Sequence, residues 1–480
     1  MIAGRRVPVG RLGITLILLL GASHPVAGQT GSASAATSVT PQNPLLGSVP
    51  TGQATTKPLP LSLKDAFDRA LKYNLGVIES DQATRAAHAA RLRSLNALVP
   101  DLTARVTSTV QQINLRALGF FLNFPGVRIP YIVGPFGVAD ARAYLSQEVF
   151  NWSDIKNLKS ATQSQKAAEY NYRNDRELVV LTTANAYLLV VSDAATVDST
   201  RAQVDTAKAL YRRTSDQHKA GVVAAIDELR SQVELQTQQQ RLIAAENQLA
   251  IDKLSLARII GLPNGQEFQL TDTVPYAPLA GMSLDETLQQ AYTKRSDYMS
   301  AKEQVRAAEL ARQAAAAENY PTVSVDTNFG DIGSPNFSSS HETFAFEASL
   351  NIPVFQGTRV RADKLQADSA LQQRKAELED LRGKIDDQVR TAFLNLKSSS
   401  ELVSVAQNNI NLAHQTLTQS QDRFSSGVAD NLEVVQAQES VATAEQSYIA
   451  SLFSYNLAKV SLAQAIGIAE QSALQFLGEK

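Results

Sequence analysis

Two acidic residues stand at the same place after two matching turns. Asp227 follows Gly221 by six residues, and Glu433 follows Gly427 by six residues. Each of these glycines is followed by valine, and each lies between two long helical runs. A carboxylate at a helix start can bind cations or basic side chains, and it also stabilises the helix through the dipole. Both roles are open for Asp227 and Glu433.

Other residue types that carry catalysis or bind metals are sparse. The chain has no cysteine, so it has neither disulfides nor thiolate chemistry. The sequence contains no glycine-rich phosphate loop and no G-x-S-x-G motif. No two histidines lie three or four residues apart among His24, His88, His218, His341 and His414. We therefore expect no enzyme activity, no metal site and no cofactor. The net charge of −2 gives no reason to expect nucleic acid as a partner.

The amino-terminal region reads as an export signal followed by a leader. Residues 1–28 combine a basic start, eleven apolar residues at 12–22 and a small-residue cleavage site, which is typical of a secretory signal peptide. Residues 29–60 are rich in Thr, Ser, Pro and Gly and predict a flexible leader. A later apolar stretch covers 178–191 and is too short to span a bilayer, and we interpret it as a buried part of a longer helix.

The rest of the chain is a duplication. We assign the copies to residues 61–263 and 282–468, with a linker at 264–281 and a short C-terminal tail at 469–480. The offset between matching residues falls from 221 to about 205, which places an insertion of about sixteen residues within 112–139 of the first copy. The matching pairs are Ser62-Leu63 with Ser283-Leu284, Pro100 with Pro321, Val149-Phe150 with Val354-Phe355, and Ile260-Gly261 with Ile466-Gly467.

Each copy predicts a short helix, two strands, a very long helix, the glycine turn and a returning helix. Residues 153–219 contain neither Pro nor Gly, and residues 358–426 contain only Gly383, so each predicts a helix of about 100 Å. A period of seven along the second hairpin predicts close coiled-coil pairing. The large stripe is Val434, Val441, Tyr448, Tyr455 and Leu462, and the small stripe is Ala437, Ala444, Ser451, Ala458 and Ala465.

The strands favour a membrane barrel over a soluble coiled-coil rod. Four segments of about ten residues alternate apolar and polar side chains, and a tilted strand of that length crosses a bilayer. Strands in lipid must form a closed barrel, because an open edge leaves amides unpaired. Four strands are too few to close, so we expect three chains and twelve strands. Polar side chains would line the lumen, among them Thr103, Arg105, Thr107, Asp326 and Asn328.

Taken in this order, the features resemble the TolC-type outer-membrane efflux proteins over about residues 61–468. The run Pro353-Val354-Phe355-Gln356-Gly357-Thr358-Arg359, where the chain returns to helix, also fits that family. The resemblance implies a mainly α fold in which duplicated coiled-coil hairpins of a homotrimer form an α-barrel across the periplasm. Four strands per chain would complete a twelve-stranded β-barrel in the lipid of the outer membrane.

The resemblance also implies a function. The chain would be the outer-membrane channel of a tripartite efflux or type I secretion system, docked to a periplasmic adaptor and an inner-membrane pump. The alternative is that the chain is itself a periplasmic adaptor, which also has a helical hairpin. An adaptor usually has one hairpin within compact β-domains, and it lacks paired strands after prolines. The transported substrate is not indicated by the sequence.

In the family, the two turns close the channel entrance. An arginine two places after the second glycine and acids six and nine places after it take part in closure. Here those positions hold Ala429, Glu433 and Gln436, so only Glu433 keeps the charge. We expect entrance gating by Asp227, Glu433 and Gln436, with closure weaker than the family pattern gives.

The turns are also the predicted docking surface for the adaptor. The candidates are His218, Gly221, Phe424 and Gly427. For His218 and Phe424, each three residues before a turn glycine, simple packing within the tip is an equal alternative.

Overall fold

A computed structural model describes residues 43–120, 130–272, 276–278, 283–335, 337 and 339–478. The predicted signal peptide and the first part of the predicted leader lie outside these residues. The rest of the leader, from residue 43 to 60, is ordered, so the expectation of flexibility was wrong there. It contains the 3₁₀ helix η1 (Pro44–Leu46) and the start of strand β1 (Leu59–Leu61). The buried Asn74 side chain donates a hydrogen bond to the Leu45 carbonyl at 2.8 Å, which holds this segment on the fold.

Two very long helices organise the chain, as the sequence predicts. Each of them is followed by a glycine turn and a returning helix. Shorter helices precede the strands of each copy, and the first of each pair begins with a capping box, at Ser62 and Ser283. The bounds are α1 (Leu63–Tyr73), α2 (Leu75–Asn96), α3 (Trp152–Lys219), α4 (Ala225–Ile259), α5 (Leu284–Lys294), α6 (Ser296–Ala317), α7 (Arg359–Ser425) and α8 (Asn431–Ile466).

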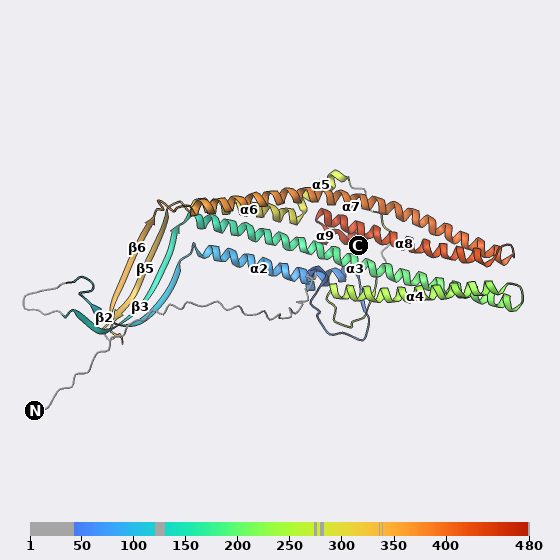
Figure 1. Ribbon diagram of the computed structural model, residues 1–480, viewed down its shortest axis with the longest axis horizontal. Coiled ribbons are helices and arrows are strands. Elements are labelled where there is room, and N and C mark those ends of the chain that lie inside the picture. Colours follow the sequence, from blue (N-terminus) through green and yellow to red (C-terminus); the bar gives the residue numbers. More distant parts are fainter. Residues whose placement is uncertain are drawn as a thin grey trace, which may run out of the picture. The chain divides into compact units, whose positions relative to one another are not determined.

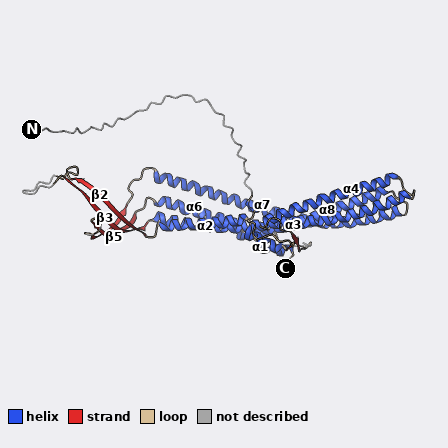
Figure 2. Cartoon of the chain, turned by 90° about the horizontal axis from the view of Figure 1, so that it is seen from below, coloured by secondary structure: helices blue, strands red, loops and turns tan. Residues whose placement is uncertain are grey.

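The four strands predicted from alternation form one antiparallel sheet in the order β2-β3-β5-β6. Figures 1 and 2 show them gathered at one end of the helices. The predicted length of about ten residues is too short for the first copy. Parts of the insertion, placed at residues 112–139, lie in the two long strands of the first copy, and 121–129 lie outside the described residues. The strands are β2 (Asp101–Asn114), β3 (Ile132–Phe150), β5 (Thr322–Gly333) and β6 (His341–Asn351).

The helices lie side by side in a fixed order. Next to the sheet the order is α2, α3, α6, α7, and next to the glycine turns it is α4, α3, α8, α7. One edge of the chain therefore carries β2, α2 and α4, and the other carries β6 and α7. Each edge strand and each edge helix has a neighbour on only one side within the described part of the chain.

A central core fills the region where the short helices meet, and it includes parts predicted to lie outside the repeats. The predicted linker contains β4 (Phe268–Leu270), which pairs in parallel with β1. The segment predicted as a C-terminal tail contains the helix α9 (Ala469–Leu477). Its apolar residues recur every four positions and are fully or almost fully buried, namely Ala469, Ala473 and Leu477.

The apolar stretch at 178–191 lies in the same core. Helix α3 contains a window of 18 residues that is apolar enough, by length and composition, to cross a membrane. A core helix passes the same test, and Val180, Tyr187 and Val190 are at most 1% exposed. The prediction of a buried helical segment is therefore confirmed.

The heptad stripes are packed as predicted. Val434, Val441 and Leu462 are at most 5% exposed, and the small residues Ala437 and Ala444 are at most 9% exposed. Helices α7 and α8 pack along their length. The small residues lie in the seam and let the two backbones approach closely.

Enlarging a seam residue is expected to destabilise the hairpin. Ala444→Leu should lower the free energy of unfolding by about 1–3 kcal/mol, because the added carbons have no free volume. The exposed Gln446 is the matched control, and Gln446→Leu should change it by less than about 0.5 kcal/mol. Thermal melting of the two variants checks this, and equal melting temperatures would contradict the assignment of the seam.

Candidate functional site

The two glycine turns are the same helix-ending motif. Gly221 and Gly427 have φ values of +73° and +71°, which glycine adopts without strain. After the first, the Val222 amide donates to the Gln217 carbonyl at 2.9 Å, and the Gly221 amide donates to the His218 carbonyl at 2.8 Å. The second repeats both bonds from residues 428 and 427. This is the Schellman motif, and it explains why one chain uses the same Gly-Val pair twice.

The helices that follow the turns begin differently. Asp430 caps α8, since its side chain accepts from the Glu433 amide at 3.3 Å. Ala224 precedes α4 and provides no side-chain cap. The fully buried Asn431 donates through Nδ2 to the Asp227 carbonyl at 3.0 Å. This bond joins the start of one returning helix to the start of the other.

The two predicted gating acids have basic partners within their own hairpins. Arg423 Nε lies 3.3 Å from Glu433 Oε1, and the Ser420 hydroxyl donates to the same oxygen at 3.3 Å. Arg230 Nη1 lies 3.6 Å from Asp227 Oδ1. These arginines do not occupy the position that the family pattern uses, which holds Ala429 here. Both acids are therefore at helix starts and in ion pairs at once.

His218 is engaged inside the first tip. Its Nδ1 lies 2.6 Å from Glu228 Oε2. Hydrogen bonds from Ser215 and then His218 lower the pKa of the Glu228 carboxyl below its usual range. The side chain of His218 is 39% exposed, so part of it remains accessible from solvent.

The other predicted tip residues differ in exposure. Phe424 is 8% exposed and packs with Leu210 and Val434, under the guanidinium of Arg213. Its side chain therefore fits the packing alternative and not direct docking. Gln436 is exposed at the surface of α8.

Sequence reasoning missed two features of the tips. Asn431 was not singled out, because a polar residue after an aspartate reads only as part of a turn. Val222 and Val428 are 70% and 71% exposed, and so each turn carries a protruding apolar side chain. The repeated Gly-Val pair was the signal for these valines.

The sheet has one strongly apolar face. Leu102, Val106 and Val110 are 70–73% exposed and recur every four residues on one face of β2. On β6, Phe344 and Phe346 are 77% and 66% exposed and lie opposite residues 329 and 327 of β5. Apolar side chains so exposed on one face of a sheet suit contact with lipid. The apolar stretch of β2 spans about eight residues, or roughly 20–25 Å in height when tilted.

The opposite face of the sheet is polar, and its register places charges in rows. Asp101 lies opposite Ser146, which lies opposite Asp326, which lies opposite Glu347. Four residues further along β2, Arg105 lies opposite Arg142. The polar residues predicted for the lumen share this face, since Thr103, Tyr144 and Asn328 form another row.

Charge on this face is unevenly paired. Arg142 is held by Asp140, with Nε to Oδ1 at 2.7 Å, and by Asn328 at 3.3 Å. Within the described residues, no Lys or Arg forms an ion pair with Asp101, Asp326 or Glu347. The face carries five acids and two arginines per chain: Asp101, Asp140, Glu148, Asp326 and Glu347 against Arg105 and Arg142.

Comparison with known proteins agrees with this arrangement of strands and turns. A family model described as "Outer membrane efflux protein" matches residues 133–262 and 287–468. The chain belongs to the outer membrane efflux protein family. The first matched segment lies in the second part of the first copy and the second segment covers nearly all of the second copy, and the family is one of outer-membrane transport proteins.

Relatives of this efflux protein are distant in sequence. The chain is 25% identical over 329 residues to the probable efflux pump outer membrane protein TtgC of Pseudomonas putida. That match covers 64% of each protein, so the chain spans just under two thirds of this relative's length. It is 22% identical over 353 residues to the outer membrane protein TolC of Escherichia coli, covering 70% of each.

Solved structures share the fold of this efflux protein. The outer membrane protein VceC of Vibrio cholerae superposes with a TM-score of 0.72 at 17% identity, over 84% of this chain and 96% of VceC. The CmeC outer membrane channel of Campylobacter jejuni gives 0.73 at 16% identity, over 89% and 92%. The predicted fold class, long helical hairpins with a strand contribution, is confirmed.

Proposed function

We propose that three copies of this chain form an outer-membrane channel that exports solutes from the periplasm to the outside of the cell. The observation that carries the proposal is the four-stranded sheet, which has one apolar face, one polar face and, among the described residues, no partner strand at either edge. Edge strands in lipid need partners. Antiparallel pairing of β6 with β2 of the next chain supplies them, and three chains give a twelve-stranded barrel wide enough for an aqueous lumen.

The helices, which extend away from the membrane, have their open edges in line with the edges of the sheet. Strand β2 is preceded by α2, and β6 is followed by α7, so the edges of the sheet and of the helical layer coincide. Each chain then contributes two glycine turns to one mouth. The names of relatives such as TtgC, an efflux pump outer membrane protein, support efflux as the task.

We also propose how the chain is processed and which parts of it form the channel wall and the docking surface. Residues 1–28 direct export and are removed, and the two copies at 61–263 and 282–468 form the channel wall. A periplasmic adaptor and an inner-membrane pump act at the tips, where Gly221, Gly427 and the exposed part of the His218 side chain form the docking surface. The exposed valines beside the glycines add apolar area to it. The alternative, that the chain is itself an adaptor, has no use for a sheet with a lipid-facing side.

Planar-bilayer recording tests the proposed function. Purified full-length protein added to one side should produce discrete, long-lived current steps of uniform size. A protein that remains in the aqueous phase, or that binds lipid without conducting, would overturn the channel proposal and favour the adaptor.

Removing the acidic side chains at the entrance is expected to widen the mouth of the channel. Asp227→Asn together with Glu433→Gln removes up to six carboxylates and frees Arg230 and Arg423 from their ion pairs. Single-channel conductance should rise, and block by divalent cations from the tip side should weaken. Gln436 stands nine places after Gly427, where the family has an acid. Gln436→Ala should change conductance and cation block little, because the glutamine side chain carries no charge.

The same double variant separates gating from helix stabilisation. If the acids only stabilise helix starts, the variant loses about 0.3–1 kcal/mol per charge in stability. Its conductance and cation block would then equal those of the unchanged protein, and that outcome would remove Asp227 and Glu433 from the gating residues.

The charged rows of the inner face are expected to make the channel cation-selective. The face carries a net charge of −3 per chain, and rings of acids favour cations in pores. Asp101→Asn with Asp326→Asn and Glu347→Gln should move the reversal potential in a salt gradient toward no preference. Arg105→Gln should move it in the opposite sense, and unchanged potentials in both variants would contradict this account of the lumen.

A further inference from the structure

A small polar cavity lies between the two helical hairpins of the chain. Its volume is about 180 Å³, and residues of α3, α4, α7 and α8 all contribute to its wall. The polar lining includes Glu234 and Gln238 of α4, His414 of α7, and Gln438 and Glu445 of α8. These residues lie about 15–30 Å along the helices from the turn glycines. The cavity is therefore separate from the acids of the tips.

Two glutamines in the wall lack hydrogen-bond partners. Gln238 is 2% exposed and Gln438 is 8% exposed. Gln238 donates through Nε2 to Glu234 Oε1 at 2.8 Å, but its Oε1 accepts no hydrogen bond from the described residues. Neither amide atom of Gln438 has a partner among them. Because an unpaired buried polar group costs free energy, this wall suits a ligand that forms hydrogen bonds.

The wall of the cavity carries negative charge. Glu234 is 9% exposed, and the side chain of Glu445 is 19% exposed. Glu445 Oε2 accepts from the Ser199 hydroxyl and from the Gln203 amide at 3.0 Å, and Oε1 lies 3.4 Å from Nε2 of the half-exposed His414. No Lys or Arg is among the residues that line the cavity. Two carboxylates in one small cavity favour a cation.

The neighbouring Arg241 does not supply the missing positive charge. Its guanidinium is within electrostatic reach of Glu234. Both of its terminal nitrogens, however, donate to the Glu439 carboxylate at 2.9 Å. The charge that balances Glu234 and Glu445 therefore has to come from a ligand.

The size of the cavity indicates the class of cation. Within the described part of the chain, no three His, Asp or Glu side chains are grouped so that they could hold a metal ion directly. A water molecule occupies about 30 Å³ in the liquid, so 180 Å³ corresponds to about six of them. Magnesium gives up its water reluctantly and is usually bound through one or two carboxylates. Its water molecules are donors, and the carboxylates and amide oxygens of this wall are acceptors.

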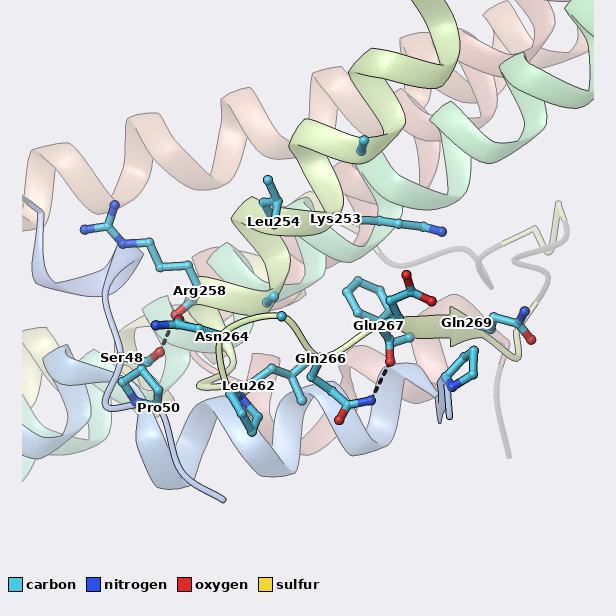
Figure 3. A pocket seen from close by; sticks show the side chains of 16 residues that line it. Ser48, Pro50, Lys253, Leu254, Arg258, Leu262, Asn264, Gln266, Glu267 and Gln269 are labelled. Carbon is cyan, nitrogen blue, oxygen red and sulfur yellow. Dashed lines mark hydrogen bonds between the residues drawn. The ribbon is translucent and has the colours of Figure 1, made fainter. Parts of the chain in front are cut away.

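A second hollow shows that these features are particular to the cavity between the hairpins. This hollow of about 900 Å³ lies beside α4 and the segment around β4 (Figure 3). Its charged side chains are Lys253, Arg258 and Glu267. Among its lining residues, no buried side-chain nitrogen or oxygen lacks a hydrogen-bond partner. The second hollow therefore has neither the negative charge nor the unpaired groups that call for a cation.

We propose that the cavity between the hairpins binds one divalent metal ion that keeps its water shell. Glu234 and Glu445 balance the charge of the ion, and its water molecules donate to these carboxylates and to the glutamine oxygens. The ion thereby joins α4 of the first hairpin to α8 of the second. The two acids are far apart in the sequence, so local spacing gave no sign of the site. The site lies within one chain and goes beyond the proposed channel function.

Thermal melting with magnesium tests the site. The full-length protein is melted without and with about 10 mM MgCl₂, in about 0.15 M NaCl to screen weak binding at exposed acids. Magnesium should raise the melting temperature of the unchanged protein by about 2–4 °C. Glu234→Gln together with Glu445→Gln should lose most of this rise. The control, Asp205→Asn with Glu401→Gln, removes two exposed acids of α3 and α7 and should keep it.

A milder variant keeps the test valid if the double variant fails to fold. Gln238→Met retains both acids and the size of the side chain but removes one unpaired acceptor. It should weaken the magnesium affinity about three- to tenfold in a titration by calorimetry. Equal magnesium affinity in Gln238→Met and the unchanged protein would place the ion elsewhere and overturn the proposal.

Manganese locates the ion directly. Crystals grown with MnCl₂ should give an anomalous peak between Glu234 and Glu445, about 4 Å from the nearest carboxylate oxygen, as a retained water shell requires. The absence of a peak, or an equal magnesium shift in the double variant and its control, would overturn the site. A shift caused by an aliphatic diamine and not by magnesium would replace the metal ion with an organic cation. A protein that conducts but does not respond to magnesium would remove this site and leave the channel function intact.

Discussion

Val106→Arg is expected to remove most of the folded protein from the outer membrane, whereas Thr107→Arg is expected to leave its amount nearly unchanged. The two residues are neighbours on β2, but Val106 is 72% exposed on the apolar face and Thr107 lies on the polar face opposite Asp140. An arginine facing lipid near the bilayer midplane costs about 2–4 kcal/mol. Three copies would multiply that to about 6–12 kcal/mol per trimer.

The measurement is the quantity of folded protein in isolated outer membranes for the two variants at equal expression. Because the substitutions are identical and adjacent, a difference between them reports which face meets lipid. Equal losses, or a greater loss for Thr107→Arg, would contradict the assignment of the apolar face to the membrane.

Lys459→Met is expected to stabilise the protein at neutral pH. Lys459 on α8 is fully buried, and its ammonium has a 3.4 Å contact to Asn456 Oδ1 and lies 4.6 Å from the centre of the Tyr455 ring. Burial lowers the pKa of Lys459 to about 8. Keeping this charge inside the fold therefore costs free energy, of order 3 kcal/mol at most.

The sign of the pH dependence follows from the lowered pKa. Between about pH 8 and 10.5 the unfolded chain holds the Lys459 proton and the folded chain does not, so stability rises with pH. The free-energy cost of keeping the charged Lys459 ammonium buried is fully present below pH 8. Lys459→Met should raise the free energy of unfolding by about 1–3 kcal/mol at pH 7, with a smaller gain at pH 10.

Thermal melting at the two pH values checks this. The exposed Lys384 is the control, and Lys384→Met should shift neither curve by more than about 0.5 kcal/mol. A Lys459→Met variant that melts lower than the unchanged protein at pH 7 would show that the ammonium has a stabilising role.

The repeated parts of the fold were predictable from sequence because local rules determine them. Glycine at 221 and 427 marks the two turns, since the left-handed conformation there favours glycine. The long run without Pro or Gly, and the second run interrupted only by Gly383, gave α3 and α7 to within one residue at each end. Heptad spacing identified the large and small stripes, of which Val434 and Ala444 are buried members.

The parts that were not predictable depend on contacts between distant residues. Strand β4 forms in the linker only because residues 268–270 pair with residues 59–61. Helix α9 was read as a tail, since its burial depends on the core beneath it. At the site, spacing found Asp227 and Glu433, but their partners Arg230 and Arg423 and the Asn431 link required the arrangement of both hairpins.

The number of chains in the conducting particle tests the central claim most directly. Native mass spectrometry of the full-length protein, extracted in mild detergent from membranes in which it conducts, gives that number. The account predicts one species with three times the mass of the mature chain, because three sheets of four strands close the barrel. A stable monomer or dimer that forms pores of the same conductance would contradict it.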